Sequence, residues 1–172
     1  MTSDDHAKNL GRLMVNLQSL EFALRAVLLK HKEGSEPSGN LENLTVGDCV
    51  PVNSFTSYAS LGKLIEEFNK LVSQRHSACR VDPAVVDTRD ALAHGRVAGK
   101  GLEGPMELLK FGRRKPTGQG QAKCVPVTHA VTMDKQWFDQ QITFVHDQLA
   151  KVCEASKTMG QGVLSGSISV RA

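Results

Sequence analysis

The residues best suited to chemistry lie together in the segment Arg89-Asp-Ala-Leu-Ala-His94-Gly95. The planar guanidinium of Arg89 suits phosphate oxygens, and the imidazole of His94 exchanges protons near neutral pH. Asp90 precedes His94 by one helical turn, so we expect its carboxylate to orient the imidazole and to hold one tautomer. These residue types at this spacing predict a phosphoryl-transfer site.

A short helix is expected to carry these three side chains. Asp82 offers a capping side chain, and Pro83 suits the first position of a helix. Gly95 is expected to end the helix in the left-handed conformation, which places His94 in the last turn. The apolar side of this helix is supplied by Val85, Val86, Leu92 and Ala93.

Three more amphipathic helices are predicted from apolar spacings of three and four residues. The first begins at Ser3, and the second near Ser54 or Thr56, either of which could cap it. The last begins around residues 132–134. Glu21 and Arg25 form an i,i+4 pair that we interpret as solvated at the rim of the core. The apolar positions are Leu10, Leu13, Leu17, Leu20, Leu24 and Val27; then Leu61, Leu64, Ile65, Phe68, Leu71 and Val72; then Phe138, Ile142, Val145, Leu149 and Val152.

Two short β-favouring runs, Met106 to Phe111 and Cys124 to Thr132, predict a hairpin within residues 97–132. Pro126 makes the second strand an edge or irregular strand. Residues 32–53 are predicted to form a long surface loop, and the Gly/Ser-rich residues 157–172 a flexible tail. The sequence therefore predicts a mainly α fold: a four-helix up-and-down bundle, with a small β-hairpin before the last helix, in one domain over residues 1–156.

The composition is that of an ordinary globular protein: 172 residues, 40% hydrophobic, 23% charged and a net charge of +3. No stretch is long and apolar enough to cross a membrane, and the chain starts without the features of a signal peptide, so we expect a cytoplasmic protein. No C-x-x-C or H-E-x-x-H pattern occurs, so neither a metal nor another cofactor is predicted. The four scattered cysteines, expected to be reduced and structural, are Cys49, Cys79, Cys124 and Cys153.

Positive charge is concentrated in the segment from Arg96 to Lys123, which contains seven basic residues and only two acidic ones. Such a segment can hold a phosphate backbone without reading its sequence. The alternative is an ordinary solvated basic loop. Aromatic residues make up only 5% of the chain, so sequence-specific stacking on bases is not predicted. The candidate substrate-binding residues are Arg96, Arg113, Arg114 and Lys115.

The segment Arg89 to Gly95 resembles the HEPN superfamily, whose motif is written R-x4-6-H. The order of helices and hairpin is also similar, so the resemblance covers most of the chain except the tail. Many members of that superfamily are metal-independent endoribonucleases of toxin-antitoxin and other defence systems, and act as dimers whose motifs meet in one cleft. Arg25 and His31 also fit the loose pattern, but they lack the polar neighbour and the glycine, so we interpret them as a coincidence.

The resemblance implies attack of an RNA 2′-hydroxyl on the adjacent phosphate. His94 would shuttle the proton, Arg89 would stabilise the transition state and Asp90 would position His94. A homodimer would supply both a base and an acid, and an antitoxin or regulatory protein is a possible further partner.

Three alternatives stay open. Arg89 could be structural, paired with Asp90 or Glu21, while His94 caps the helix. A HEPN-like bundle without catalysis would bind a protein partner or a nucleotide. An unrelated helical protein could carry the motif by chance.

Overall fold

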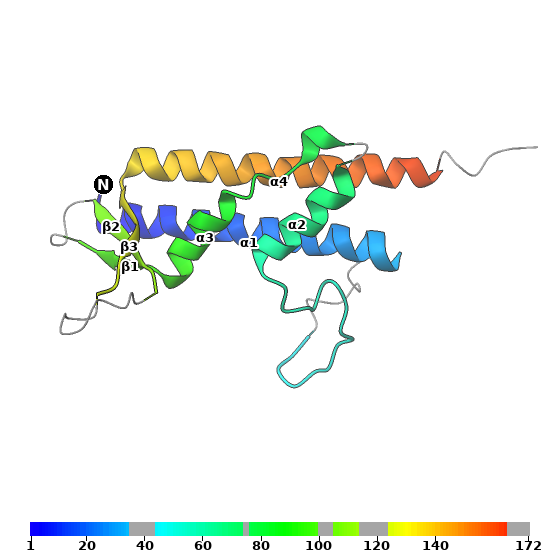
Figure 1. The fold of residues 1–172 in the computed structure, drawn as a ribbon, viewed down its shortest axis with the longest axis horizontal. Helices are drawn as coiled ribbons and strands as arrows, with labels where there is room; N and C mark the ends of the chain where they lie inside the picture. Colours follow the sequence, from blue (N-terminus) through cyan, green and yellow to red (C-terminus); the bar gives the residue numbers. More distant parts are fainter. Residues whose placement is uncertain (35–43, 74–75, 100–104, 114–123, 165–172) are drawn as a thin grey trace, which may run out of the picture. The chain divides into compact units, whose positions relative to one another are not determined.

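The computed structural model describes residues 1–34, 44–73, 76–99, 105–113 and 124–164. The described chain is mainly helical with one small antiparallel sheet (Figure 1). The predicted mainly α class is therefore confirmed, whereas the up-and-down bundle and the single domain over residues 1–156 stay predictions. The elements are α1 (Ser3–Glu33), α2 (Leu61–Val72), a 3-10 turn η2 (Ser77–Cys79), α3 (Val85–His94), β1 (Arg96–Ala98), β2 (Met106–Phe111), β3 (Val127–Met133) and α4 (Lys135–Leu164).

The chain divides into two compact units. Unit 1 comprises Met1–Val15 and Ala84–Phe144, and unit 2 comprises Asn16–Pro83 and Val145–Ala172. The candidate motif and the whole sheet belong to unit 1. Helix α2 and the segment that leads into it belong to unit 2.

The sheet has three strands in the order β1-β2-β3, so the predicted simple hairpin is wrong in its strand number. The hairpin itself is present as β2 and β3, and Leu108 pairs with Val131 across it. The additional strand β1 follows α3 after one residue and pairs Arg96 with Leu109. Three residues are too few to show a period of two, which is why the sequence gives no signal for β1. The edge position of β3, directly after Pro126, agrees with the prediction for that strand.

Helix α2 begins at Leu61 and not near Ser54 or Thr56. Ser60 is its N-cap, and the Ser60 hydroxyl accepts a hydrogen bond from the Lys63 backbone N–H at 3.4 Å. The earlier residues are held in a turn, because the Asn53 side-chain oxygen accepts hydrogen bonds from two backbone N–H groups, those of Phe55 and Thr56. Such a turn competes with helix formation, so the helix starts only after it.

Helix α3 begins at Val85, and its N-cap position is Ala84, two residues after the predicted Asp82. The backbone N–H of Asp82 donates a hydrogen bond to the Gln148 side-chain oxygen at 2.9 Å. Pro83 and Ala84 form a turn between this contact and the helix. The sequence pattern located the helix correctly and misplaced its start by two residues.

Helix α4 starts at Lys135, where the carboxylate of Asp134 accepts a hydrogen bond from the Trp137 backbone N–H at 2.8 Å. The helix continues to Leu164, so residues 157–164 of the predicted tail are helical. Two parts of the predicted irregular segments lie outside the described residues: residues 35–43 of the loop and residues 165–172 of the tail.

The predicted apolar faces supply most of the buried core. In α1 only Leu10 of the six predicted positions stays partly exposed, and in α2 only Leu71 does. The core side chains of β2 and α4 include Leu108, Phe138, Val145 and Val152. Burial of these side chains supplies the main stabilisation of the fold.

Candidate functional site

The three motif residues lie on the outer side of α3. The helix is anchored through Val85 and Ala91, which are fully buried. The side chains of Arg89 and Asp90 are 38% and 36% exposed, and His94 is exposed in the last turn. All three functional groups are therefore accessible from solvent.

Gly95 ends α3 for a different reason from the one predicted. Its φ of −77° and ψ of 176° are extended, not left-handed, and its N–H donates to the Ala91 carbonyl at 2.7 Å. A Cβ at this position would overlap that carbonyl oxygen and would lie 2.8 Å from the Leu108 side chain. The glycine is needed because the end of the helix and strand β2 approach each other closely.

Asp90 is paired with two cations. Its carboxylate lies 3.3 Å from Nη1 of Arg89 and 3.9 Å from Nζ of Lys110. Within the described residues it makes no hydrogen bond to His94, which was the predicted partner. Asp90 is thus positioned to pair with Arg89, and no carboxylate among the described residues pairs with the imidazole of His94.

Lys110 was missed by the sequence reasoning. It lies on β2, two residues after the buried Leu108, and α3 packs against this strand. The alternation of a strand puts Lys110 and Leu108 on one face, so a contact with α3 was predictable once that packing was assumed. A second missed contact fixes α3, because the Thr88 hydroxyl donates to the Gln141 side-chain oxygen at 2.7 Å.

Two of the four candidate substrate-binding residues are described. Arg96 opens β1, and its guanidinium lies 5.5 Å from the centre of the Phe111 ring, within reach of a cation–π interaction. Arg113 is exposed shortly after β2. Arg114 and Lys115 lie outside the described residues. Arg96 and Arg113 therefore place positive charge at the surface of unit 1, which carries the motif.

The second match to the R-x4-6-H pattern has a different environment. The Arg25 side chain is 13% exposed and binds the carboxylate of Glu21 at 2.7 Å. The predicted i,i+4 pair therefore exists, with its Glu21 side chain 30% exposed and its Arg25 side chain mostly buried. The same guanidinium donates to the carbonyls of Ser57 and Ala59 at 2.6 and 2.9 Å. Arg25 is therefore committed to the fold and is not available to a phosphate, in contrast to Arg89.

No group of three or more metal-ligating side chains occurs in the ranges that the structure describes. The four cysteines are free thiols. No described helix is long and apolar enough to span a bilayer. Comparisons with protein-family models, with curated proteins and with solved structures gave no match to this chain.

Proposed function

We propose that the chain is a HEPN-like, metal-independent endoribonuclease that acts as a homodimer in the cytoplasm, as a component of a toxin-antitoxin or other defence system. The observation that carries this proposal is the exposure of both Arg89 and His94 at the end of α3. A four-helix bundle is part of the same proposal. An antitoxin or regulatory protein would then be a partner.

The proposed reaction is an intramolecular transesterification. A ribose 2′-oxygen attacks the adjacent phosphorus, the bond from phosphorus to the 5′-oxygen breaks, and the products are a cyclic 2′,3′-phosphate and a 5′-hydroxyl. His94 accepts the proton of the 2′-hydroxyl, and His94 of a second copy donates one to the leaving oxygen. Arg89 stabilises the negative charge that develops on the phosphoryl oxygens.

The surroundings of Arg89 revise one role in this mechanism. Asp90 contacts Arg89 and Lys110, so its proposed role is to position the guanidinium and not the imidazole. Arg96 and Arg113 extend the positive surface of unit 1 and would contact the RNA backbone.

The pairing of Arg89 with Asp90 also favours a second candidate function. A structural ion pair of this kind suits a HEPN-like module without catalysis that binds a protein partner or a nucleotide. In that case His94 would have no substrate, and its replacement would leave every activity unchanged.

Incubation of the purified protein with mixed RNA in EDTA tests the proposal. The unmodified chain should give fragments with cyclic phosphate ends, and Arg89→Ala and His94→Ala should give none. His31→Ala is the matched control, because His31 is an exposed histidine from the second match to the motif. No cleavage by the unmodified chain, or equal cleavage by all variants, would favour the non-catalytic module.

The proposed dimer has its own test. Sedimentation should show a dimer at the concentration used for cleavage. Mixing an excess of His94→Ala into the unmodified chain should lower the activity of the unmodified chain if the two motifs share one site, because a mixed dimer holds only one of the two imidazoles. A strictly monomeric protein with full activity would contradict the shared site.

A further inference from the structure

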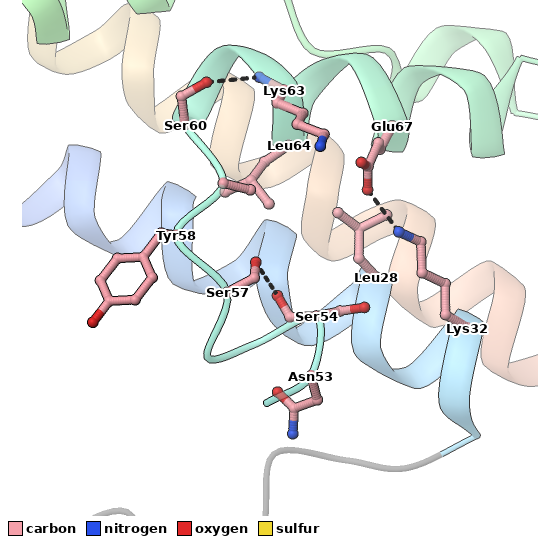
Figure 2. A pocket seen from close by; sticks show the side chains of 11 residues that line it. Leu28, Lys32, Asn53, Ser54, Ser57, Tyr58, Ser60, Lys63, Leu64 and Glu67 are labelled. Carbon is pink, nitrogen blue, oxygen red and sulfur yellow. Dashed lines mark hydrogen bonds and ion pairs between the residues drawn. The ribbon is translucent and has the colours of Figure 1, made fainter. Parts of the chain in front are cut away.

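Unit 2 contains an open cavity of about 680 Å³ between the second half of α1, the start of α2 and the segment that joins them (Figure 2). Leu28 and Leu64 contribute apolar side chains to its lining, and both are buried. The volume lies in the range of small-molecule sites, which typically enclose about 300–1,000 Å³. The motif residues of α3 take no part in it.

The wall of this cavity is fixed by contacts with α1. Arg25 donates hydrogen bonds to the backbone carbonyls of Ser57 and Ala59, and to that of Phe55 at 3.4 Å. The Phe55 ring packs edge-to-face on Phe22, with ring centres 5.1 Å apart. The cavity is therefore preformed, and a ligand would not have to pay the entropy of ordering its wall.

The wall offers hydroxyl groups. Ser54 and Ser57 lie on the connecting segment, and Ser60 stands where α2 begins (Figure 2). The Ser57 hydroxyl donates to the Ser54 carbonyl at 3.3 Å and accepts a hydrogen bond from Arg25 at 3.4 Å, so one lone pair of its oxygen is left as an acceptor. Hydroxyl side chains on one wall suit a ligand that itself carries hydroxyl groups.

The charged side chains that line the cavity do not cancel one another completely. Lys32 and Glu67 form an ion pair of 2.7 Å across the cavity lining. The hydrogen bond from Lys32 lowers the pKa of Glu67, so this carboxyl stays ionised and neutralises Lys32. Lys63 lines the same cavity, and its ammonium makes no ion pair or hydrogen bond with the residues that the structure describes. The cavity thus holds a net charge of +1 and one cation able to bind an anion.

We propose that this cavity binds a small phosphorylated polyol, of the sugar-phosphate or nucleoside-monophosphate class. The phosphoryl group lies at Lys63, because lysine binds phosphate as a point charge. The hydroxyl groups of the ligand lie against Ser54 and Ser57. Ser60 already caps α2, so the lysine and not the helix end supplies the anion site. The site is independent of the proposed ribonuclease centre, since it belongs to the other unit.

Titration with ribose 5-phosphate, followed by calorimetry and by backbone amide NMR, tests this proposal. Ribose 5-phosphate should bind and shift the amide signals of Ser54, Ser57 and Lys63, whereas ribose alone should bind much more weakly. Lys63→Gln should weaken binding by about tenfold or more, the value of one charge-assisted hydrogen bond. Lys70→Gln is the matched control on the same helix, where Lys70 is exposed and paired with Glu66 at 2.6 Å.

Three outcomes would overturn the proposal. The first is no binding of ribose 5-phosphate or AMP at millimolar concentration, and the second is equal affinity for ribose and ribose 5-phosphate. The third is equal weakening by Lys63→Gln and Lys70→Gln, which would assign binding to general surface charge. Unchanged melting temperatures for both variants exclude loss of folding as the cause of a weakened signal.

Discussion

The side-chain amide of Asn69 forms two hydrogen bonds with the backbone of Val81. Its Nδ2 donates to the Val81 carbonyl at 2.8 Å, and its Oδ1 accepts from the Val81 N–H at 2.8 Å. Both residues are buried, so water cannot replace either bond. Asn69 thereby fastens the segment after α2 to that helix, as a strand partner would.

Replacing Asn69 by alanine is expected to destabilise the protein by about 3 kcal/mol, because two buried backbone groups lose their partners. Urea unfolding measures this loss directly. Ser73→Ala is the control, since the Ser73 hydroxyl makes one exposed hydrogen bond, to the Lys70 carbonyl at 2.8 Å. Equal stability of Asn69→Ala and the unmodified chain would contradict the assigned role.

Gly95→Ala is expected to destabilise the protein by about 2 kcal/mol, because the added methyl group forces the helix end away from β2. The backbone carbonyl of Ala91 cannot move aside as a flexible side chain can. Gly11→Ala provides the opposite case: its Cβ would meet no atom within 4 Å, and α1 should gain about 0.5–1 kcal/mol. Thermal unfolding of both variants checks the two signs, and a neutral Gly95→Ala would refute the close approach.

The helices and the hairpin were predictable because apolar spacing is a local signal. The contacts that join distant segments were not predictable in the same way. Glu21 was identified as a partner of Arg25, since both lie on one helix, whereas the carbonyls of Ser57 and Ala59 that Arg25 also binds lie more than 30 residues away. Asn69 looks like an ordinary polar helix residue until Val81 is placed beside it.

The candidate site shows the same division. The segment from Arg89 to Gly95 was found in the sequence, and the exposure of Arg89 and His94 agrees with a site open to solvent. Helical spacing suggested His94 as the partner of Asp90, whereas the contacts that the structure shows for Asp90 are with its neighbour Arg89 and with the strand residue Lys110. Arg114 and Lys115 stay predictions, since they lie outside the described residues.

His6 should make the stability depend on pH. Its side chain is 5% exposed, and the ring packs edge-to-face on Phe138. Neither ring nitrogen has a hydrogen-bond partner among the residues that the structure describes. Burial lowers the pKa of His6 below the ordinary value of 6.5. Above pH 6.5 the imidazole is mostly neutral in both the folded and the unfolded state, so it does not reduce the free energy of unfolding. As the pH falls below 6.5, the unfolded chain takes up a proton that the folded chain rejects, so stability is lost.

The expected size of this loss is about 1.4 kcal/mol for each pH unit between the ordinary pKa and the folded-state pKa. Urea unfolding of the unmodified chain and of His6→Leu, at about pH 7.5 and about pH 5.5, isolates the contribution. His31→Leu is the control, because His31 is exposed on the same helix. If the difference between His6→Leu and the unmodified chain is the same at both pH values, His6 is not the titrating group.

Arg89 and Lys110 both lie within ion-pair distance of the Asp90 carboxylate. In the proposed ribonuclease the carboxylate offsets the positive charge of Arg89 and Lys110. Asp90→Asn should therefore tighten the binding of single-stranded RNA, and should steepen its salt dependence by about one counterion. Lys110→Gln should do the reverse. Fluorescence anisotropy with labelled RNA, in the His94→Ala background so that the RNA stays intact, measures both effects.

Asp139→Asn is the matched control for this experiment, because Asp139 belongs to the same unit and forms an exposed ion pair with Lys135 at 2.6 Å. General electrostatics would change the affinity of Asp139→Asn as much as that of Asp90→Asn. If Asp90→Asn tightens RNA binding and Lys110→Gln weakens it, and both changes exceed that of Asp139→Asn, the RNA phosphates lie beside Arg89. Equal affinities for Asp90→Asn, Lys110→Gln and Asp139→Asn would mean that RNA does not contact α3, which would leave Arg89 as the structural partner of Asp90.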